Sequence, residues 1–470
     1  MKADRFFELL QNIDKKLIAR AAKRRNNNKA IIIRMVAFAA CLAIVVTGGV
    51  HIMLSRAPKV SALAVAEYPE QVPYPTADFK TDYELYKKQK AAWNENKFWE
   101  YDTDPTGNAD YVKKLVSSLL EDDGKNKVVS PANIYFALAM LCETTNGNSQ
   151  KQILDLLGRS DVESLRENSY ILWRQMYSDD GHTTSILANS LWLNENCAKN
   201  YKQSTFDILK DKYFASAYSG DFTKEQYITT IRDWINEQTG GLLKDNVEKL
   251  NFSPETVMAL VSTIYYKAPW QNEFIVSNTK RGLFHTANGD VGVDFMNCSS
   301  VGNVYYSDNF VSASKALEEG YMHFILPDEG YTVDDILKDE KALELISQNY
   351  SAVENKGVIV NLSVPKFDVS FDTDLAPSLK KLGVTDVFEM GKADFSPVGD
   401  VENMFISKAE HAARLKIDET GVEAAAYTAM GLCGGGIPDD EVDFVLDRPF
   451  IFVITGCDNL PLFVGIVNNP

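Results

Sequence analysis

The feature that most limits how this chain can fold is a run of twenty mostly apolar residues near its N-terminus, Met35–Leu54. As a helix such a run is about 30 Å long, which matches the hydrocarbon thickness of a bilayer. Lysines and arginines crowd the residues before it, and the positive-inside rule then places the N-terminus in the cytoplasm. We therefore expect a basic cytoplasmic segment 1–34, a single transmembrane helix 35–54, an extracellular linker 55–108 and a folded domain 109–470.

A signal peptide is the competing interpretation of the same segment, and it predicts a secreted protein. Gly48, Gly49 and His51 weaken the span, and Ser61–Ala66 has the small-residue spacing of a cleavage site. However, a basic leader of 34 residues is long for a signal peptide. The uncleaved anchor is therefore the favoured interpretation.

Charge is distributed unevenly along the chain. Residues 1–34 hold ten Lys/Arg and three Asp/Glu, whereas the remainder holds 38 Lys/Arg and 62 Asp/Glu. A strongly acidic body repels nucleic acid and anionic lipid, so neither is expected as a partner of the folded part. A basic leader before one span and an acidic exterior are compatible with a bacterial cell-surface protein.

The cysteines and the catalytic motifs argue against a metal site, a cofactor or an enzyme. No CxxC pair and no Cys/His ligand spacing occurs, and free thiols are expected. No GxSxG, HExxH or P-loop occurs either. The six cysteines are widely scattered: Cys41, Cys142, Cys197, Cys298, Cys433 and Cys457.

Helical patterns dominate the first part of the folded domain and strand patterns the second, which indicates an α+β fold. Helices are expected at 109–121, after Ser130-Pro131 and at 224–240. Apolar runs rich in β-branched residues predict the strands 258–267, 322–326, 358–364, 404–418, 444–446, 450–455 and 462–467.

The segment Glu423–Met430 is rich in small residues and contains no proline. In an extended conformation, Val422, Ala424, Ala426 and Thr428 share one face, and Tyr427 falls on the other. A small, nearly apolar face suits a strand that must slip between existing strands, because a bulky or charged residue would be overpacked or left unpaired there. The alternative interpretation of this segment is an Ala-rich helix.

Short motifs along residues 109–470 resemble those of the serpins, the serine-protease inhibitor family, in order and spacing. Together they cover nearly a whole serpin domain. The motifs are Ser130–Ile134, Leu187–Trp192, Ile235–Thr239, Leu260–Lys267 with Trp270 and Phe274, Pro365–Phe367, Ala393–Ser396, Ser407–His411, Glu419–Thr428 and Arg448–Phe452.

The resemblance implies helices packed around three β-sheets with an exposed reactive-centre loop, and a monomer that acts as a suicide substrate. A protease would cleave the loop, remain attached as an acyl-enzyme and be trapped as the cleaved loop enters the main sheet. The resemblance assigns the hinge of the loop to Glu419, Gly421, Val422, Glu423, Ala424, Ala425, Ala426 and Thr428.

The resemblance also implies a polar cluster beneath the main sheet, the shutter, at Ser130, Asn133, Ser262 and His411. Trp270 corresponds to the breach, where the loop first enters. Asn133 stands where the family usually has serine, and Ser262 where it usually has asparagine. Our hypothesis is that the exchanged amide reaches the same buried partners from the opposite side.

Family loop length places the scissile bond between Gly435 and Gly436, although counting back from Pro449 moves it toward Pro438. Glycine offers nothing to a deep specificity pocket, so the expected target is an elastase-like or subtilisin-like protease, with some cysteine proteases as a further class. The alternative function is a non-inhibitory serpin that acts as a cell-surface binding module. Such serpins usually have bulky, charged or proline-containing hinges, which this hinge lacks.

Overall fold

A computed structural model describes one compact unit, Val60–Pro470, with short gaps. The described residues are 60–77, 81–97, 103–248, 250–401, 403–422, 438, 440–457 and 459–470. Among these residues no helix is long and apolar enough to cross a membrane. The expected transmembrane segment 35–54 lies outside the described residues.

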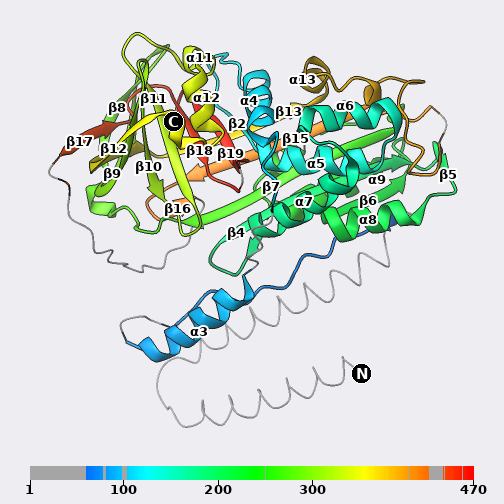
Figure 1. Cartoon of the computed structure of the whole chain (residues 1–470), viewed down its shortest axis with the longest axis horizontal. Helices are drawn as coiled ribbons and strands as arrows, with labels where there is room; N and C mark the ends of the chain where they lie inside the picture. The colour runs from blue at the N-terminus through cyan, green and yellow to red at the C-terminus, as the bar shows by residue number, and fades with distance from the viewer. Residues whose placement is uncertain are drawn as a thin grey trace. The chain divides into compact units, whose positions relative to one another are not determined.

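The main sheet has eight strands and runs across the domain (Figure 1). Parallel and antiparallel pairs both occur in it. Its order is β1 (Ser61–Ala64), β6 (Ala215–Gly220), β4 (Thr184–Asn194), β7 (Met258–Pro269), β16 (Gly421–Val422), β15 (Lys408–Ile417) and β13 (Phe367–Asp374), with β3 (Ser178–Asp179) paired to β4.

A second sheet of nine strands forms the other end of the domain. Every residue of its strands β18 and β19 is buried, as expected for continuous apolar runs in a core. Its order is β17 (Glu441–Val445), β12 (Glu354–Pro365), β9 (Gly289–Tyr306), β10 (Phe310–Ala316), β11 (Tyr321–Pro327), β18 (Phe450–Ile454), β19 (Phe463–Val467) and β2 (Lys127–Val129), with β8 (Lys280–Thr286) paired to β9; β5 (Ala198–Lys199) and β14 (Asp400–Val401) form a separate pair.

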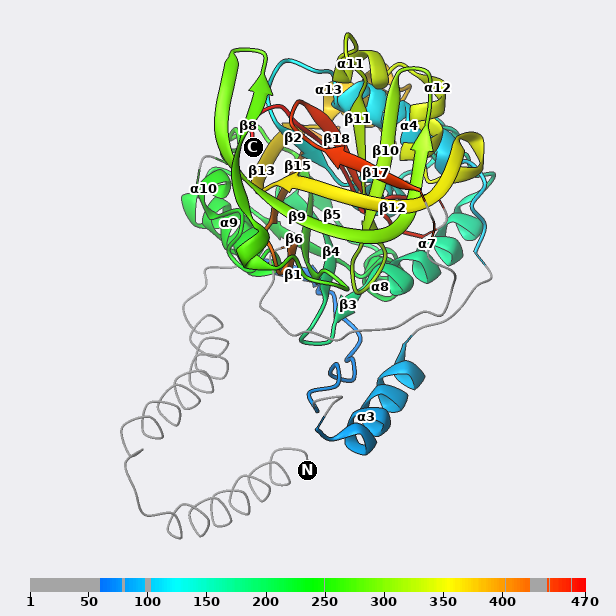
Figure 2. The same ribbon diagram turned by 90° about the vertical axis from the view of Figure 1, so that its left-hand side faces the viewer.

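Helices cover both faces of the main sheet (Figure 2). Side chains of β4 alternate between two cores: Leu187 and Leu191 pack into the larger core, and Ala188 and Trp192 into a smaller one with Trp234. The first face carries α4 (Asn108–Leu119), α5 (Pro131–Glu143), α6 (Gly147–Leu157), α7 (Val162–Met176) and α8 (Gln203–Tyr213); the second carries α9 (Glu225–Gln238) and α10 (Lys244–Val247).

Short helices complete the domain and leave a mixed α and β architecture. Helix α5 is buried along its whole length, with Ser130 as N-cap and Pro131 at its first position. The remaining helices are α11 (Val333–Ile336), α12 (Glu340–Ile346), α13 (Ala376–Lys381) and the 3₁₀ turns Val276–Asn278, Tyr350–Ala352 and Asp386–Phe388.

Residues 60–97 pack as part of the domain, although the sequence suggests that they belong to a linker. Strand β1 extends the main sheet beyond β6, with Ser61 opposite Ser219. The helix α3 (Tyr83–Asn96) follows, and its Trp93 donates a hydrogen bond to Asp180 Oδ2 at 2.7 Å. The prolines and charges of this segment suggest a polar stalk, but Tyr74 and Trp93 are buried against the domain.

Candidate functional site: the gap between β7 and β15

The central strands β7 and β15 pair with each other along only part of their length. Their parallel ladder runs from Lys408 opposite Ala259 to Ala412 opposite Thr263. Beyond this ladder the two-residue strand β16 lies between them (Figure 1). Val422 pairs with Ala268 on β7 and with Ile417 on β15, and it is fully buried. The first residues of the expected hinge therefore already occupy the end of the gap.

An aromatic pair holds the chain that leads into β16. Trp270 is 2% exposed, and its Nε1 donates to the carbonyl of Asp418 at 2.8 Å. Its backbone N–H donates to the carbonyl of Thr420, and that of Phe274 donates to the carbonyl of Glu419. Trp270, which the resemblance assigns to the breach, thus lies at the entrance of the gap and with Phe274 holds the three residues before Gly421.

A buried ion pair secures the same entrance. Glu419 lies 2.7 Å from Lys366 Nζ and accepts a hydrogen bond from the Thr279 hydroxyl at 2.8 Å. Burial alone would raise the pKa of Glu419, but these two donors outweigh it and lower that pKa below its ordinary value. The carboxylate is therefore charged at neutral pH and ties the chain before β16 to the residue that precedes β8 and to the turn between β12 and β13.

The four residues of the expected shutter lie together under the paired part of β7 and β15. The Asn133 amide donates to Ser262 Oγ at 2.8 Å and to the carbonyl of Thr263 at 2.6 Å. Ser130 caps α5 by accepting from the N–H of Asn133, and its own N–H donates to His411 Nε2. All four are at most 1% exposed. The cluster therefore joins α5 to both central strands.

His411 is neutral within this cluster. Burial lowers the pKa of its imidazole to about 3. Because Nε2 accepts from Ser130, the ring proton is assigned to Nδ1, which faces Ser262 Oγ at 3.4 Å. A neutral ring can accept on one side and donate on the other, so it connects α5 and β7 through β15.

Several residues of the site do not emerge from the sequence patterns. Asn189 of β4 donates to Asn133 Oδ1 at 3.1 Å and so extends the shutter to a third strand. Lys366 and Thr279 hold Glu419, as described above. Asn189 and Lys366 both stand within short motifs that point to the family, but only the folded geometry gives them partners.

The remaining assigned positions lie outside the described residues. These are Glu423, Ala424, Ala425, Ala426 and Thr428 of the hinge and the expected scissile pair Gly435 and Gly436. The chain on either side of them is anchored, by β16 in the main sheet and by β17, which pairs in parallel with β12, in the second sheet.

Comparison with known proteins identifies the family. The model of the family described as "Serpin (serine protease inhibitor)" matches residues 106–470. The chain belongs to the serpin family. The fold and family expectations are thereby confirmed, and the family is one of protease inhibitors rather than enzymes.

Individual serpins support this membership. An alpha-1-antitrypsin-like protein, GS55-MS, of Ictidomys tridecemlineatus is 33% identical over 365 residues, which cover 74% of this chain and 84% of that protein. The structure of the thermophilic serpin tengpin in its native state has a TM-score of 0.69 and 27% identity, covering 80% of this chain and 97% of tengpin. Human thyroxine-binding globulin with bound thyroxine gives a TM-score of 0.67 and 26% identity, covering 78% and 98%.

Proposed function

We propose that this serpin inhibits its target protease as a suicide substrate, by inserting its cleaved reactive loop between β7 and β15. The observation that carries the proposal is β16, whose Val422 is buried between these strands at the end of the gap. Alternation from Val422 directs Ala424, Ala426 and Thr428 to the same buried face. All three are small enough to follow Val422 without overpacking the core.

In the proposed reaction, the nucleophile of the protease attacks the carbonyl carbon of Gly435, and the bond to the nitrogen of Gly436 breaks. The protease stays attached to Gly435 as an acyl-enzyme. Loop residues after Val422 then enter the gap as a new strand and carry the protease with them. Each inhibitor molecule is consumed by one such event.

The proposed target is an elastase-like or subtilisin-like protease. Leu432, Cys433 and the glycines around the proposed bond offer no basic side chain to a deep pocket. Proteases with shallow pockets tolerate such small residues, whereas trypsin-like proteases require a positive charge.

A matched pair of hinge variants tests the mechanism. The full chain is incubated with each protease, and a complex that survives boiling in detergent is measured. The wild type is expected to form this complex. Ala424→Arg is expected to abolish it and leave a cleaved loop, since arginine would enter the core, whereas Ala425→Arg, on the opposite face, is expected to preserve it.

The alternative is a non-inhibitory serpin that binds a partner at the cell surface. The similarity to thyroxine-binding globulin, whose structure contains thyroxine, favours testing it. Under this alternative, wild type and both arginine variants are cleaved without a covalent complex. That outcome, across both protease classes, would overturn the inhibitory proposal.

We propose further that residues 1–34 and 35–54 tether the serpin domain 109–470 to the outer face of a cell membrane. The support is the apolar run and the basic residues before it. The membrane fraction is expected to retain the full chain after washing at high salt, and to release it when residues 1–54 are deleted. Recovery of a secreted chain that begins after the Ser61–Ala66 segment would support signal cleavage instead.

A further inference from the structure

Lys315 of β10 is a buried lysine without an ion pair among the described residues. The residue is 8% exposed, and its Nζ lies 3.6 Å from Cys298 Sγ. The ammonium lies over the ring of Phe274, 4.3 Å from its centroid, and 5.7 Å from that of Trp270. Buried lysines normally have a carboxylate partner, whereas the polar partner of Lys315 is a thiol.

The environment of Lys315 favours its neutral amine. Burial lowers the pKa of Lys315, and only the nearby Cys298 opposes this shift. A neutral amine next to a thiol can act as a general base toward it. The resulting ammonium and thiolate would form the ion pair that Lys315 otherwise lacks, with the two aromatic rings stabilising the cation.

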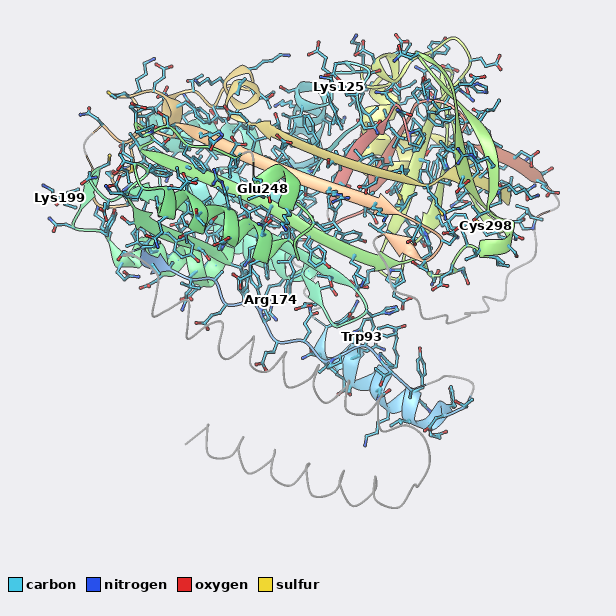
Figure 3. All side chains as sticks on the ribbon, turned by 180° about the vertical axis from the view of Figure 1, so that it is seen from behind. Trp93, Lys125, Arg174, Lys199, Glu248 and Cys298 are labelled. Atoms are coloured by element: carbon cyan, nitrogen blue, oxygen red, sulfur yellow. The ribbon has the colours of Figure 1, made fainter. Side chains whose placement is uncertain are left out.

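Cys298 of β9 can be reached by small solutes. It is a free cysteine and only half-buried. Cys298 is among the residues that line a surface cavity, together with Asn278, Asn297, Asn361 and Ser363. Figure 3 places Cys298 at the end of the domain opposite Lys199. The residue is thus partly exposed, and its sulfur lies beside a buried amine.

We propose that Cys298 and Lys315 form a peroxide-reactive thiol site. Lys315 takes the proton of the thiol, and the thiolate sulfur attacks one oxygen of hydrogen peroxide or a small hydroperoxide. The O–O bond breaks, and the leaving hydroxide or alkoxide takes the proton back from Lys315. Sulfur is oxidised by two electrons to a sulfenic acid, and the peroxide is reduced to water or an alcohol.

The site lies directly behind the entrance of the gap between β7 and β15. The two rings that contact the ammonium of Lys315 belong to Trp270 and Phe274, which hold the backbone of residues 418–420. A new oxygen on Cys298 adds an acceptor for Lys315 and changes what the ammonium contacts. Oxidation would therefore act next to the residues that position the hinge.

Peroxide labelling of the full chain tests the site. The protein is treated with hydrogen peroxide in the presence of dimedone, which captures sulfenic acids, and the adduct on each cysteine peptide is measured by mass spectrometry. Cys298 is expected to be labelled in the wild type. Lys315→Met is expected to slow this labelling at least tenfold, and Cys298→Ser to remove it.

Lys280→Met is the matched control, because Lys280 is an exposed lysine that lines the same cavity. It is expected to label Cys298 at the wild-type rate. Cys142, which is fully buried, stays unlabelled while the protein remains folded and so reports whether each variant is intact. Equal labelling of Cys298 in folded Lys315→Met and wild type, or none in the wild type, overturns the proposal.

Discussion

Asn133 connects three elements of the domain through one amide. Its Nδ2 reaches Ser262 and Thr263 on β7, and its Oδ1 accepts from Asn189 on β4, while its backbone lies at the start of α5. Asn133 is fully buried, so loss of its amide would take these bonds from buried partners. The exchange of asparagine and serine between positions 133 and 262 therefore leaves one amide to satisfy the buried partners.

A double-mutant cycle tests this exchange. Asn133→Ser is expected to lower the free energy of unfolding by about 2–3 kcal/mol, since it leaves buried groups without partners. Ser262→Asn alone crowds two amides together and is also destabilising. The double variant is expected to recover at least about 1 kcal/mol relative to the sum of the singles. Denaturant titration measures all three.

Asn148→Ser provides the comparison at an exposed asparagine on α6, where a loss of less than about 0.5 kcal/mol is expected. Additive effects of Asn133→Ser and Ser262→Asn would show that the two positions do not share an amide site.

His411 predicts a specific loss of stability in acid. The pKa of its imidazole is about 3 in the folded protein and about 6.5 when unfolded. As the pH falls from 6.5 toward 3, the unfolded chain binds a proton that the folded chain does not. The free energy of unfolding is then expected to fall by up to about 1.4 kcal/mol per pH unit from this residue.

Thermal or urea unfolding between pH 7 and pH 4.5 measures this dependence. His411→Gln, which cannot titrate, is expected to show a shallower slope even if its stability at pH 7 is lower. Part of the slope should remain, because burial also lowers the pKa of His323, to about 4. An unchanged slope would contradict the assignment.

The residues of the site differ in how far the sequence could predict them. Ser130, Asn133, Ser262 and His411 stand in short motifs whose order indicates the family, so their assembly could be anticipated. Lys315 and Cys298 lie in no such motif, and their contact depends on the pairing of β9 with β10. Contacts between residues on separate strands follow from the register, which side-chain patterns alone do not fix.

At the scale of elements, β16 is a strand of only two residues that lies between β7 and β15. It consists of Gly421 and Val422, and both strands that flank it bond to it. Val422 is fully buried between β7 and β15, so a charged side chain at this position would be buried without a partner. The position of β16 thus depends on one apolar side chain.

Val422→Glu is expected to expel β16 from the main sheet, because burying an unpaired carboxylate costs several kcal/mol. Hydrogen–deuterium exchange should then increase at residues 417–422 and at the facing end of β7. Val445→Glu is the control, since Val445 is 40% exposed on β17, the strand that anchors the other end of the loop. Unchanged exchange in Val422→Glu would contradict the buried position.

The sequence predicts which helices and strands are present better than it predicts where they begin and end. The apolar pattern predicts a strand over 404–418, whereas β15 begins at Lys408. Met404 and Ile406 are buried in irregular chain before it, and burial without a strand produces the same apolar signal. The helix expected over 224–240 is Glu225–Gln238, which ends before the positive-φ glycines Gly240 and Gly241.

At the scale of the whole domain, residues 60–97 belong to the folded structure, although the family match begins only at residue 106. Tyr74 and Trp93 are each 7% exposed, and the Tyr74 hydroxyl donates to Glu318 at 2.8 Å. Lys97 pairs with Glu319 in the same turn between β10 and β11. The segment therefore joins the edge of the main sheet to the second sheet.

Truncation measures this contribution. A chain that begins at residue 103 is expected to unfold with a free energy several kcal/mol lower than the full chain, because two buried aromatic side chains are lost. A chain that begins at residue 60 keeps every described contact and is expected to match the full chain. Equal stability of the two truncated chains would show that residues 60–97 contribute nothing.

The parallel pairing of β7 with β15 has a consequence for the energetics of the sheet. β16 runs antiparallel to both of its neighbours. In the proposed insertion, the loop residues after Val422 would separate β7 from β15 and pair with both strands. One parallel ladder would be lost and two antiparallel ladders would form, and antiparallel pairing is slightly more stable per residue. The parallel ladder that would have to open covers five residues of β15, from Lys408 to Ala412. Under the proposed mechanism, opening this ladder would therefore form more hydrogen bonds than it breaks.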